Sequence, residues 1–246
     1  VTGPVRDPRT GIVGYPSVRD MVTRLRPAVA GLVAAGRRPL VLGGCCALVM
    51  GAVAGARDAV GRVGVLNVDG HIDAYDGATS PTGEAADIPV GALLGRAHDD
   101  LLAAMGGPPV VRSGDAVVLG SRDADEASDL GDLPDRLGIV VHDADVVTAD
   151  PAGAGRAAVE HFAAAGIGYW VHLDVDVLGQ DQFPATDYLM PGGLDLPQLA
   201  AVLAPLGADP DLLGFSVGCY NPSKDPDGTY GDRLVDVLVA ALAPAR

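Results

Sequence analysis

Two short polar motifs in this chain carry the residue types that bind metal ions. Residues 69–73 read Asp-Gly-His-Ile-Asp directly after an apolar run, and residues 172–176 read His-Leu-Asp-Val-Asp about a hundred residues later. Carboxylates gathered in apolar surroundings are costly unless they are paired or hold a metal. Oxygen and imidazole donors of this kind suit Mn²⁺ and the metals next to it. Together the motifs predict a hydrolase that works with two metal ions.

The spacing within each motif adds to this prediction. Side chains alternate sides along an extended chain, so Asp69, His71 and Asp73 are expected to share one side. Asp174 and Asp176 are expected to share one side of their own segment in the same way. The first motif alone would also fit a polar cluster that caps the end of a strand. The second motif, inside an apolar stretch, favours bound cations.

Length, composition and charge restrict the classes of function. The chain has 246 residues, of which 48% are hydrophobic and 4% aromatic, so residues 1–246 are expected to form one α/β domain with a large core. Few aromatic side chains and a net charge of −15 argue against a partner that is nucleic acid. The acidity would attract a basic substrate or a divalent cation, although solubility alone also explains it.

Three cysteines and the absence of long apolar runs bear on the compartment. Cys45, Cys46 and Cys219 are an odd number without the spacing of a disulfide framework, which favours a reducing cytoplasm. We find no signal peptide and no run long enough to cross a membrane. The chain opens on Val1 rather than Met, so we expect an N-terminal piece, including a strand, to be missing.

The elements that must position the motifs follow from a regular alternation. Short strands rich in Val and Leu alternate with helices, which predicts a three-layer α/β/α parallel sheet whose ligand site lies at the carboxyl ends of the strands. The expected strands are 38–42 (buried), 63–68, 115–120, 138–142, 169–177 and 212–217. The expected helices are 18–35 capped by Ser17, 43–60, 90–105, 151–165, 196–204 capped by Asp195, and 233–242. Cys46, Asp69, Asp174 and Asn221 all follow predicted strands or end them.

With Gly43-Gly44 upstream and Pro191-Gly192-Gly193 downstream, the paired motifs resemble the arginase/agmatinase (ureohydrolase) family from about Leu40 to the C-terminus. The resemblance implies the arginase-type fold and a dinuclear Mn²⁺ site. It also implies hydrolysis of a C–N bond in a small guanidino, amidino or formimino compound, commonly with release of urea. The relatives are homo-oligomers, often trimers or hexamers.

Carried over by residue, the resemblance assigns Asp69 and Asp174 as bridges between the two metals. His71 and Asp176 would complete one site, and Asp73 would belong to the other. Two ions about 3.5–4 Å apart would activate a shared water that attacks the guanidinium carbon. Asp73, as the proton shuttle, and His71 are the residues that the resemblance implies to be catalytic.

The first departure from the family pattern concerns a metal ligand. The family has Gly-Gly-Asp-His where this chain has Gly43-Gly44-Cys45-Cys46. Cys46 can replace the histidine, because a helix N-terminus and nearby cations should lower its pKa and favour the thiolate. A thiolate shifts the preference from Mn²⁺ toward Zn²⁺, Co²⁺ or Fe²⁺. In the alternative, Cys46 is a small buried residue without a metal bond, and the first metal is weak or absent.

Two further departures concern the substrate. The family places a His in the loop after Gly83, where alignment on that glycine puts Ala86 here, so Thr82 and Glu84, with Asp87, are the candidates for substrate binding in this loop. Cys219 stands where the family has a Glu that pairs with the guanidinium. It is a further candidate for substrate binding, and the alternative is core packing. As an alternative to the ureohydrolase, the chain could be a non-catalytic relative or a hydrolase with a single metal ion.

Overall fold

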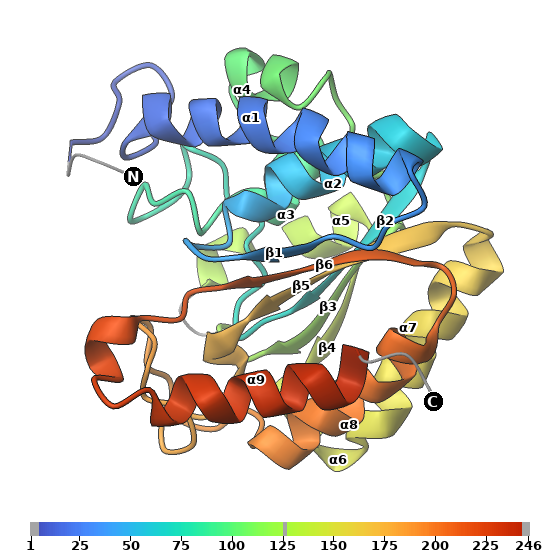
Figure 1. The fold of residues 1–246 in the computed structure, drawn as a ribbon. Coiled ribbons are helices and arrows are strands. Elements are labelled where there is room, and N and C mark those ends of the chain that lie inside the picture. Colours follow the sequence, from blue (N-terminus) through green and yellow to red (C-terminus); the bar gives the residue numbers. More distant parts are fainter. Residues whose placement is uncertain (1–4, 125–126, 243–246) are drawn as a thin grey trace.

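The structure, a computed structural model, describes residues 5–124 and 127–242. Residues 1–14 are rich in Gly, Pro, Arg and Asp, which predicts a loop, and the first four of them lie outside the described part. Six strands pair in parallel throughout, in the order β1-β6-β5-β2-β3-β4 (Figure 1). Their bounds are Leu40–Leu42 (β1), Val63–Val68 (β2), Ala116–Ser121 (β3), Ile139–Asp143 (β4), Gly168–Asp174 (β5) and Leu212–Gly218 (β6).

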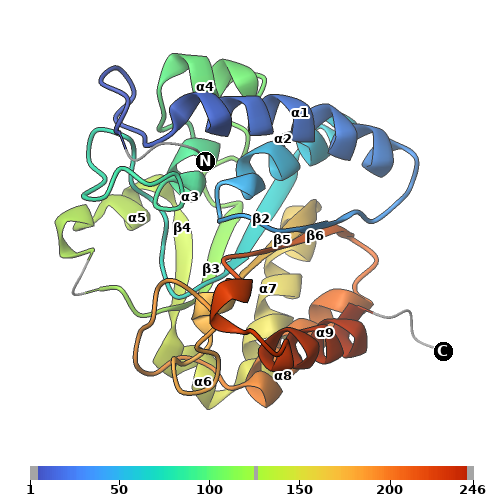
Figure 2. The same ribbon diagram turned by 60° about the vertical axis from the view of Figure 1, so that its left-hand side comes forward.

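Helices cover both faces of the sheet, as Figures 1 and 2 show. One face carries α1 (Tyr15–Ala34), α2 (Leu48–Val60), α3 (Pro89–Leu93), α4 (Asp99–Ala104) and α5 (Leu133–Leu137). The other carries α6 (Ala144–Ala149), α7 (Pro151–Ala165), α8 (Leu196–Ala208) and α9 (Thr229–Leu242). Short 3₁₀ turns lie at Ser128–Leu130 (η1), Val175–Val177 (η2) and Pro222–Lys224 (η3). The predicted three-layer α/β/α parallel sheet is confirmed.

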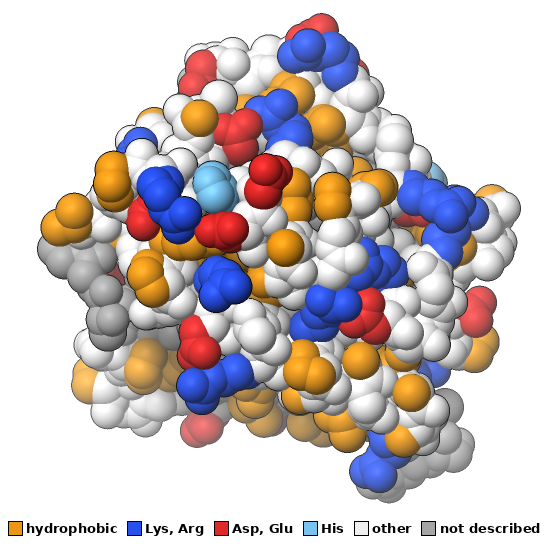
Figure 3. Space-filling model, turned by 90° about the horizontal axis from the view of Figure 1, so that it is seen from above, with side chains coloured by type: hydrophobic (Ala, Val, Ile, Leu, Met, Phe, Trp, Pro, Cys, Tyr) orange, Lys and Arg blue, Asp and Glu red, His pale blue; other side chains and the backbone are white. Residues whose placement is uncertain are grey.

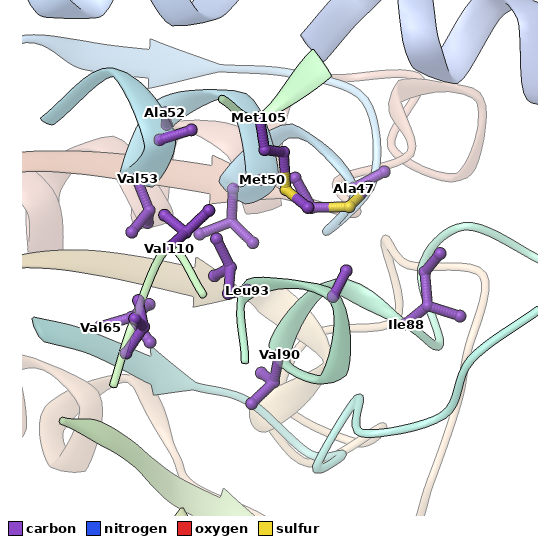
Figure 4. Close-up of a cluster of buried hydrophobic side chains, with 14 of the residues drawn as sticks. Ala47, Met50, Ala52, Val53, Val65, Ile88, Val90, Leu93, Met105 and Val110 are labelled. Atoms are coloured by element: carbon purple, nitrogen blue, oxygen red, sulfur yellow. The ribbon is translucent and has the colours of Figure 1, made fainter. Parts of the chain in front are cut away.

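The alternation of side chains along the central strands divides the core in two. In β5, Trp170 packs with the α2 side of the sheet, whereas Tyr169 and Val171 pack with the α7–α9 side. Figure 4 shows part of the first cluster, where Met50 of α2 meets Leu93 of α3 near Val110. Burial on both faces explains why the central strands are apolar without interruption. A polar side chain in these strands is therefore an exception that needs a reason.

Five helix predictions need correction, and three of them concern bounds alone. The second helix begins at Leu48 and not at residue 43, α8 ends at Ala208 and not at residue 204, and α9 begins at Thr229 and not at residue 233. The first helix begins at Tyr15, with Gly14 at the N-cap in the left-handed region (φ 62°), so Ser17 lies in the first turn and does not cap the helix. The predicted helix 90–105 is two short helices, α3 and α4. Gly95, with φ 98°, lies between them, and the His98 side chain caps α4 by accepting from the Asp100 backbone amide. A glycine at positive φ and a local cap ended a helical pattern that the apolar spacing would have continued.

The prediction that strand 38–42 is buried is wrong. Among the described residues β1 pairs with β6 alone and lies at the edge of the sheet. Leu40 and Leu42 are 50% and 66% exposed. An apolar run shows that a segment can form a strand, but it cannot tell an edge from the centre of a sheet.

The surface over α1 and α4 mixes acidic and basic side chains, as Figure 3 shows. Arg24 there pairs with Asp20 within α1, and Arg9 pairs with Asp100 of α4. On this face there is no broad basic area of the kind that binds a phosphate backbone. None of the described helices is long and apolar enough to span a bilayer.

Candidate metal centre

The two motifs meet at the carboxyl ends of neighbouring strands in the middle of the sheet. Strands β2 and β5 pair in parallel, with Val68 opposite Leu173, so Asp69 and Asp174 emerge side by side. Cys46 joins them from the short segment between β1 and α2. The chain thus brings three separate segments to the edge of the sheet where ligands bind in parallel α/β folds.

The potential metal-binding side chains form two groups, which we call the deep group and the outer group. In each group the donor atoms lie within 4.8 Å of one another. The deep group is Cys46, Asp69, His172 and Asp174, and the outer group is Asp69, His71 and Asp176. Asp69 is common to both groups, as a bridging carboxylate must be. Asp174 belongs by distance to the deep group alone, so its bridging role stays a prediction.

The deep group is buried and closely connected. The Cys46 thiol donates to Asp174 Oδ2 at 2.6 Å, and its Sγ lies 3.5 Å from the Cys219 Sγ. The hydrogen bond with Cys219, burial and the negative charge of Asp174 raise the pKa of Cys46 well above its ordinary value. The expected fall of this pKa depends on nearby cations as well as on the helix N-terminus, so it stays a prediction for the protein with metal bound. A bound cation reverses this balance, because a coordinating thiol loses its proton.

The outer group lies nearer to the solvent. His71 Nδ1 is 3.1 Å from Asp176 Oδ2 and 3.7 Å from Asp69 Oδ1. Burial lowers the pKa of His71, but hydrogen bonds to Asp176 and then Asp69 outweigh it and raise the pKa to about 12. A positive charge is thus favoured at this place, whether it is carried by the imidazole or by a metal ion.

Asp73 and Asp176 do not lie on extended backbone, so the predicted alternation of side chains does not determine their directions. Strand β5 ends at Asp174, and Asp176 lies in the 3₁₀ turn η2, where its amide donates to Asp174 Oδ1 at 2.8 Å. Asp73 has φ 54°, in the left-handed region. The direction of these two carboxylates is therefore set by turns and not by strands.

Arg122, which the sequence analysis did not single out, holds the second motif in this shape. Its guanidinium donates to the carbonyl of Asp176 at 2.6 Å and to those of Val177, Leu178 and Pro191 at 3.1–3.3 Å. Its own backbone amide donates to Gly70 in the first motif. A single arginine after a strand carries no spacing signal, so only the folded chain reveals that it ties the two motifs together.

The carboxylates of the centre are crowded and buried. Burial and then the charge of Asp176 raise the pKa of Asp69 to about 6. Burial followed by neighbouring carboxylates also raises the pKa values of Asp73 and Asp174 well above the ordinary range. Asp69 Oδ2 and Asp73 Oδ2 have no hydrogen-bond partner although they are buried. Unpaired oxygens among crowded carboxylates fit a divalent cation, so these are candidate metal-binding residues.

A pocket leads from this centre to the surface in two parts. The inner pocket, about 60 Å³, is lined by Cys46, His71, Asp73, Tyr75, Ala86, Asp87, Asp123, Asp174, Asp176, Tyr188 and Cys219. The outer pocket, about 540 Å³, shares Ala86, Tyr188 and Cys219 with it and adds Glu84, Asp187 and Asn221 among others. Asp73 and Cys219 are the non-glycine residues of the described chain with positive φ, and both line the inner pocket. Such backbone strain gathers at functional sites.

The structure brings three of the four predicted substrate-binding residues to this pocket, and Asp87 lines its inner part. Cys219 lines both parts, and Glu84 lines the outer part, where it accepts a hydrogen bond from Tyr188 at 2.7 Å. Thr82 is exposed and lines neither part, and its hydroxyl donates to Asp87. Ala86, at the position where the family has a loop histidine, does face the inner pocket.

His172 belongs to the deep group but was not predicted as a site residue. It is fully buried, and burial lowers its pKa to about 4, so its imidazole is neutral at pH 7. The signal was available in the alternation of β5: Trp170, His172 and Asp174 are two residues apart and point to the same face of the sheet. The same alternation, followed backward from Asp174, leads to His172.

Comparison with known proteins identifies one family. A model of the arginase family matches residues 7–243. The arginase of Brevibacillus brevis is 33% identical over 193 residues, which are 77% of this chain and 63% of that protein. The match thus spans less than two thirds of this relative's length.

Solved structures show the same fold at lower identity. The arginase of Bacillus caldovelox superposes with a TM-score of 0.87 at 23% identity, over 97% of this chain and 80% of that one. Formimidoylglutamase from Bacillus subtilis gives a TM-score of 0.74 at 18% identity, over 90% and 65% of the two chains. Because proteins named for different substrates share the fold, the fold by itself does not select a substrate.

Proposed function

The chain belongs to the arginase family, and on this premise we propose that it is a metal-dependent hydrolase of a C–N bond in a small guanidino compound. The observation that supports the proposal most is the pair of donor groups that share Asp69 beside the inner pocket. Cys46, His71, Asp73, Asp174 and Asp176 would hold the ions with it. The chemistry that such cations supply when bound is the activation of a water molecule at neutral pH.

Asp73 is suited to move a proton in this reaction. Its carboxylate lines the inner pocket, and Oδ2 has no partner within the protein. Its carbonyl accepts from the amides of Val90 and Gly91, which holds the strained backbone in place. His71 lies across the same pocket, so both residues that we propose as catalytic face one small space.

The outer pocket fits a cationic substrate. Glu84 and Asp187 line it, Asp87 lines the inner pocket, and the whole chain carries a net charge of −15. Acidic walls concentrate a cation and steer its entry. Cys219 offers no carboxylate at the position where the resemblance implies a guanidinium clamp, so we propose that Glu84 contributes to this recognition in its place. Thr82 would act indirectly, through its hydrogen bond to Asp87.

The metal preference is open to a direct test because the donor sets differ. Two Mn²⁺ ions are the prediction from the family resemblance, and the Cys46 thiol favours Zn²⁺, Co²⁺ or Fe²⁺ in the deep group. Metal analysis after loading with each ion, under reducing conditions, gives both identity and stoichiometry. Two ions per chain support the dinuclear centre.

The test of the reaction is a panel of guanidino, amidino and formimino compounds, assayed for urea, ammonia and formamide with each metal. We expect urea from at least one guanidino compound. Asp174→Asn should reduce turnover to background, because this carboxylate belongs to the metal centre. The absence of any product across the panel from a protein that binds two ions would contradict the proposal and leave a non-catalytic relative.

A hydrolase with one ion is the alternative candidate, acting on an acyl C–N bond. The observation that favours it is the outer group of Asp69, His71 and Asp176, which offers three ligand atoms within 4.8 Å of one another without Cys46. This alternative predicts one ion per chain, bound by Asp69, His71, Asp174 and Asp176. Release of an acyl product with a single bound ion would support it.

Three further proposals follow from the family. We propose that residues 1–246 act as one catalytic domain, because one sheet carries both motifs. We propose a homo-oligomer, trimer or hexamer, which analytical ultracentrifugation measures directly. We also propose a cytoplasmic protein, since its three cysteines are free thiols and a thiol ligand must remain reduced.

A further inference from the structure

One ring nitrogen of His172 is without a partner in the most buried part of the metal centre. His172 is 0% exposed, and its Nε2 has no hydrogen-bond partner among residues 5–124 and 127–242. A ring nitrogen of His172 lies within 4.8 Å of the donor atoms of Cys46, Asp69 and Asp174, and because Nδ1 is engaged by Ser216, Nε2 is the nitrogen free to bind an ion there. A buried nitrogen left without a partner costs about 1–3 kcal/mol. Its position therefore needs an explanation that the hydrogen bonds within the protein do not supply.

The other side of the ring is fixed by neighbouring strands. His172 of β5 lies opposite Ser216 of β6, and its Nδ1 is 2.9 Å from the Ser216 hydroxyl. The indole N–H of Trp170 donates to the same hydroxyl at 2.9 Å. The hydroxyl oxygen is also 3.4 Å from the carbonyl of Val171. Strand β5 and its neighbour β6 thus hold the imidazole in one orientation.

These contacts favour the tautomer of His172 that carries its proton on Nδ1 when Nε2 faces a cation. A tryptophan N–H can only donate, so the Ser216 oxygen must accept from it. With its own proton directed to Val171, the hydroxyl can also accept from a protonated Nδ1 of His172. Nε2 then carries the lone pair that a metal needs. A second partner that orients a ligating histidine in this way is typical of metal sites.

A close approach of the backbone leaves room for this arrangement. A Cβ added at Gly218 would lie 3.2 Å from His172 Cε1 and 3.5 Å from the Cys46 amide nitrogen. Glycine at this position lets β6 pass close to both donors. Any larger residue would press against the imidazole and the Cys46 backbone together.

We propose that His172 is a metal ligand through Nε2, and that Cys46, His172, Asp69 and Asp174 form a four-donor site of one sulfur, one nitrogen and two oxygens. The inference rests on the proposed metal centre and adds a ligand outside the set that the family resemblance supplies. A thiolate together with an imidazole and carboxylates selects Zn²⁺, Co²⁺ or Fe²⁺ over Mn²⁺. His172 in this way supplies the imidazole that Cys46 removes from the family pattern.

Cobalt is a suitable probe because it reports its ligands. We would load the reduced, full-length protein with Co²⁺ and record the sulfur-to-cobalt charge-transfer absorption and the hyperfine-shifted proton NMR spectrum in H₂O and D₂O. Binding by His172 predicts a shifted ring N–H signal that exchanges slowly, since its Nδ1–H is buried against Ser216. His71 is more exposed, and its ring N–H should exchange faster.

Variants assign the signals. His172→Gln should remove the slowly exchanging signal and weaken binding of the ion that shows the sulfur band by more than about 100-fold, since loss of an outer partner alone costs about 10–100-fold. Ser216→Ala should keep the sulfur band but weaken binding by about 10–100-fold. His161→Gln is the matched control, because His161 bonds the carbonyl of Gly114 away from the centre.

The outcomes separate this inference from the proposed function. If His172→Gln keeps both the slow signal and the affinity, or if the wild-type protein shows the sulfur band without that signal, His172 is not a ligand. If the variant does not fold, the wild-type spectrum still decides. Failure to bind Co²⁺ at all overturns the inference as well. A protein that shows the His172 signal but hydrolyses no compound of the panel keeps the ligand and loses the proposed reaction.

Discussion

The deep and outer donor groups share Asp69 but differ in burial and in the elements that carry them. Cys46 and His172 are 2% and 0% exposed, and His172 stands on a central strand. The His71 side chain is 21% exposed, and its partner Asp176 lies in a 3₁₀ turn. Both groups reach the inner pocket, but Asp69 joins a more deeply buried half to a half that is more exposed.

This difference indicates a division of tasks. The deep group has a sulfur and a nitrogen held by strands, so it can select a metal by geometry and donor type. The outer group contacts Tyr188, whose ring lies 5.9 Å from the His71 ring in an edge arrangement. We therefore expect a substrate to meet this half first. The following predictions test whether the two halves behave independently.

The largest difference between the deep and outer groups is expected in the rate at which each loses its metal ion. We expect a chelator to take the outer ion quickly and the deep ion slowly, because the deep donors are more fully buried than His71. An ion at about 100 times its Kd stabilises the fold by about 2.7 kcal/mol. For a chain of this size that is about 5–11 °C in Tm. Calorimetry and metal analysis during chelation measure both steps, and loss of both ions in one phase would contradict the comparison.

Replacing the sulfur of Cys46 should change the metal preference of the deep group alone. We expect Cys46→His to raise the affinity for Mn²⁺ relative to Zn²⁺ by about tenfold, or about 1.4 kcal/mol, because the thiolate is replaced by an imidazole. Competition titrations under reducing conditions give the ratio. Cys45→His, next to it and outside both groups, is the control and should leave the ratio unchanged. An equal change in both variants would show that Cys46 has no special role.

The smallest effect on activity is expected in the outer pocket, where Tyr188 and Glu84 lie. Tyr188→Phe removes the hydroxyl that donates to Glu84 at 2.7 Å. A hydrogen bond of this kind contributes about 0.5–1.5 kcal/mol, so KM should rise about two- to tenfold while metal content stays the same. Steady-state kinetics with metal analysis check this. A loss of bound metal in Tyr188→Phe would mean that metal binding by the outer group also depends on the hydrogen bond between Tyr188 and Glu84.

Much of the fold could be predicted because its elements carry local signals. Apolar strands with helices between them indicated the parallel sheet, and Asp195 with Gln198 forms a capping box at the start of α8. The errors arose where context decides. Gly95 and His98 interrupt a helical pattern, and β1 is an edge strand although its sequence is as apolar as that of a central one.

The metal centre was predicted in part for a similar reason. Asp69 and Asp174 lie together because parallel strands end at the same edge of the sheet, which the sequence pattern indicates. The aim of Asp73 and Asp176 depends on turns, and that of His172 on its opposite neighbour in β6. Arg122 is tied to both motifs only in the folded chain.

The sequence by itself determined which donors this protein possesses and at which end of the sheet they gather, because residue type and strand alternation are local properties. Only the tertiary structure decided how they divide into two groups, which atoms remain unpaired and which residues hold them. Those properties depend on distances between segments far apart in the chain, such as Cys46, His172 and Ser216, and no local pattern encodes such distances.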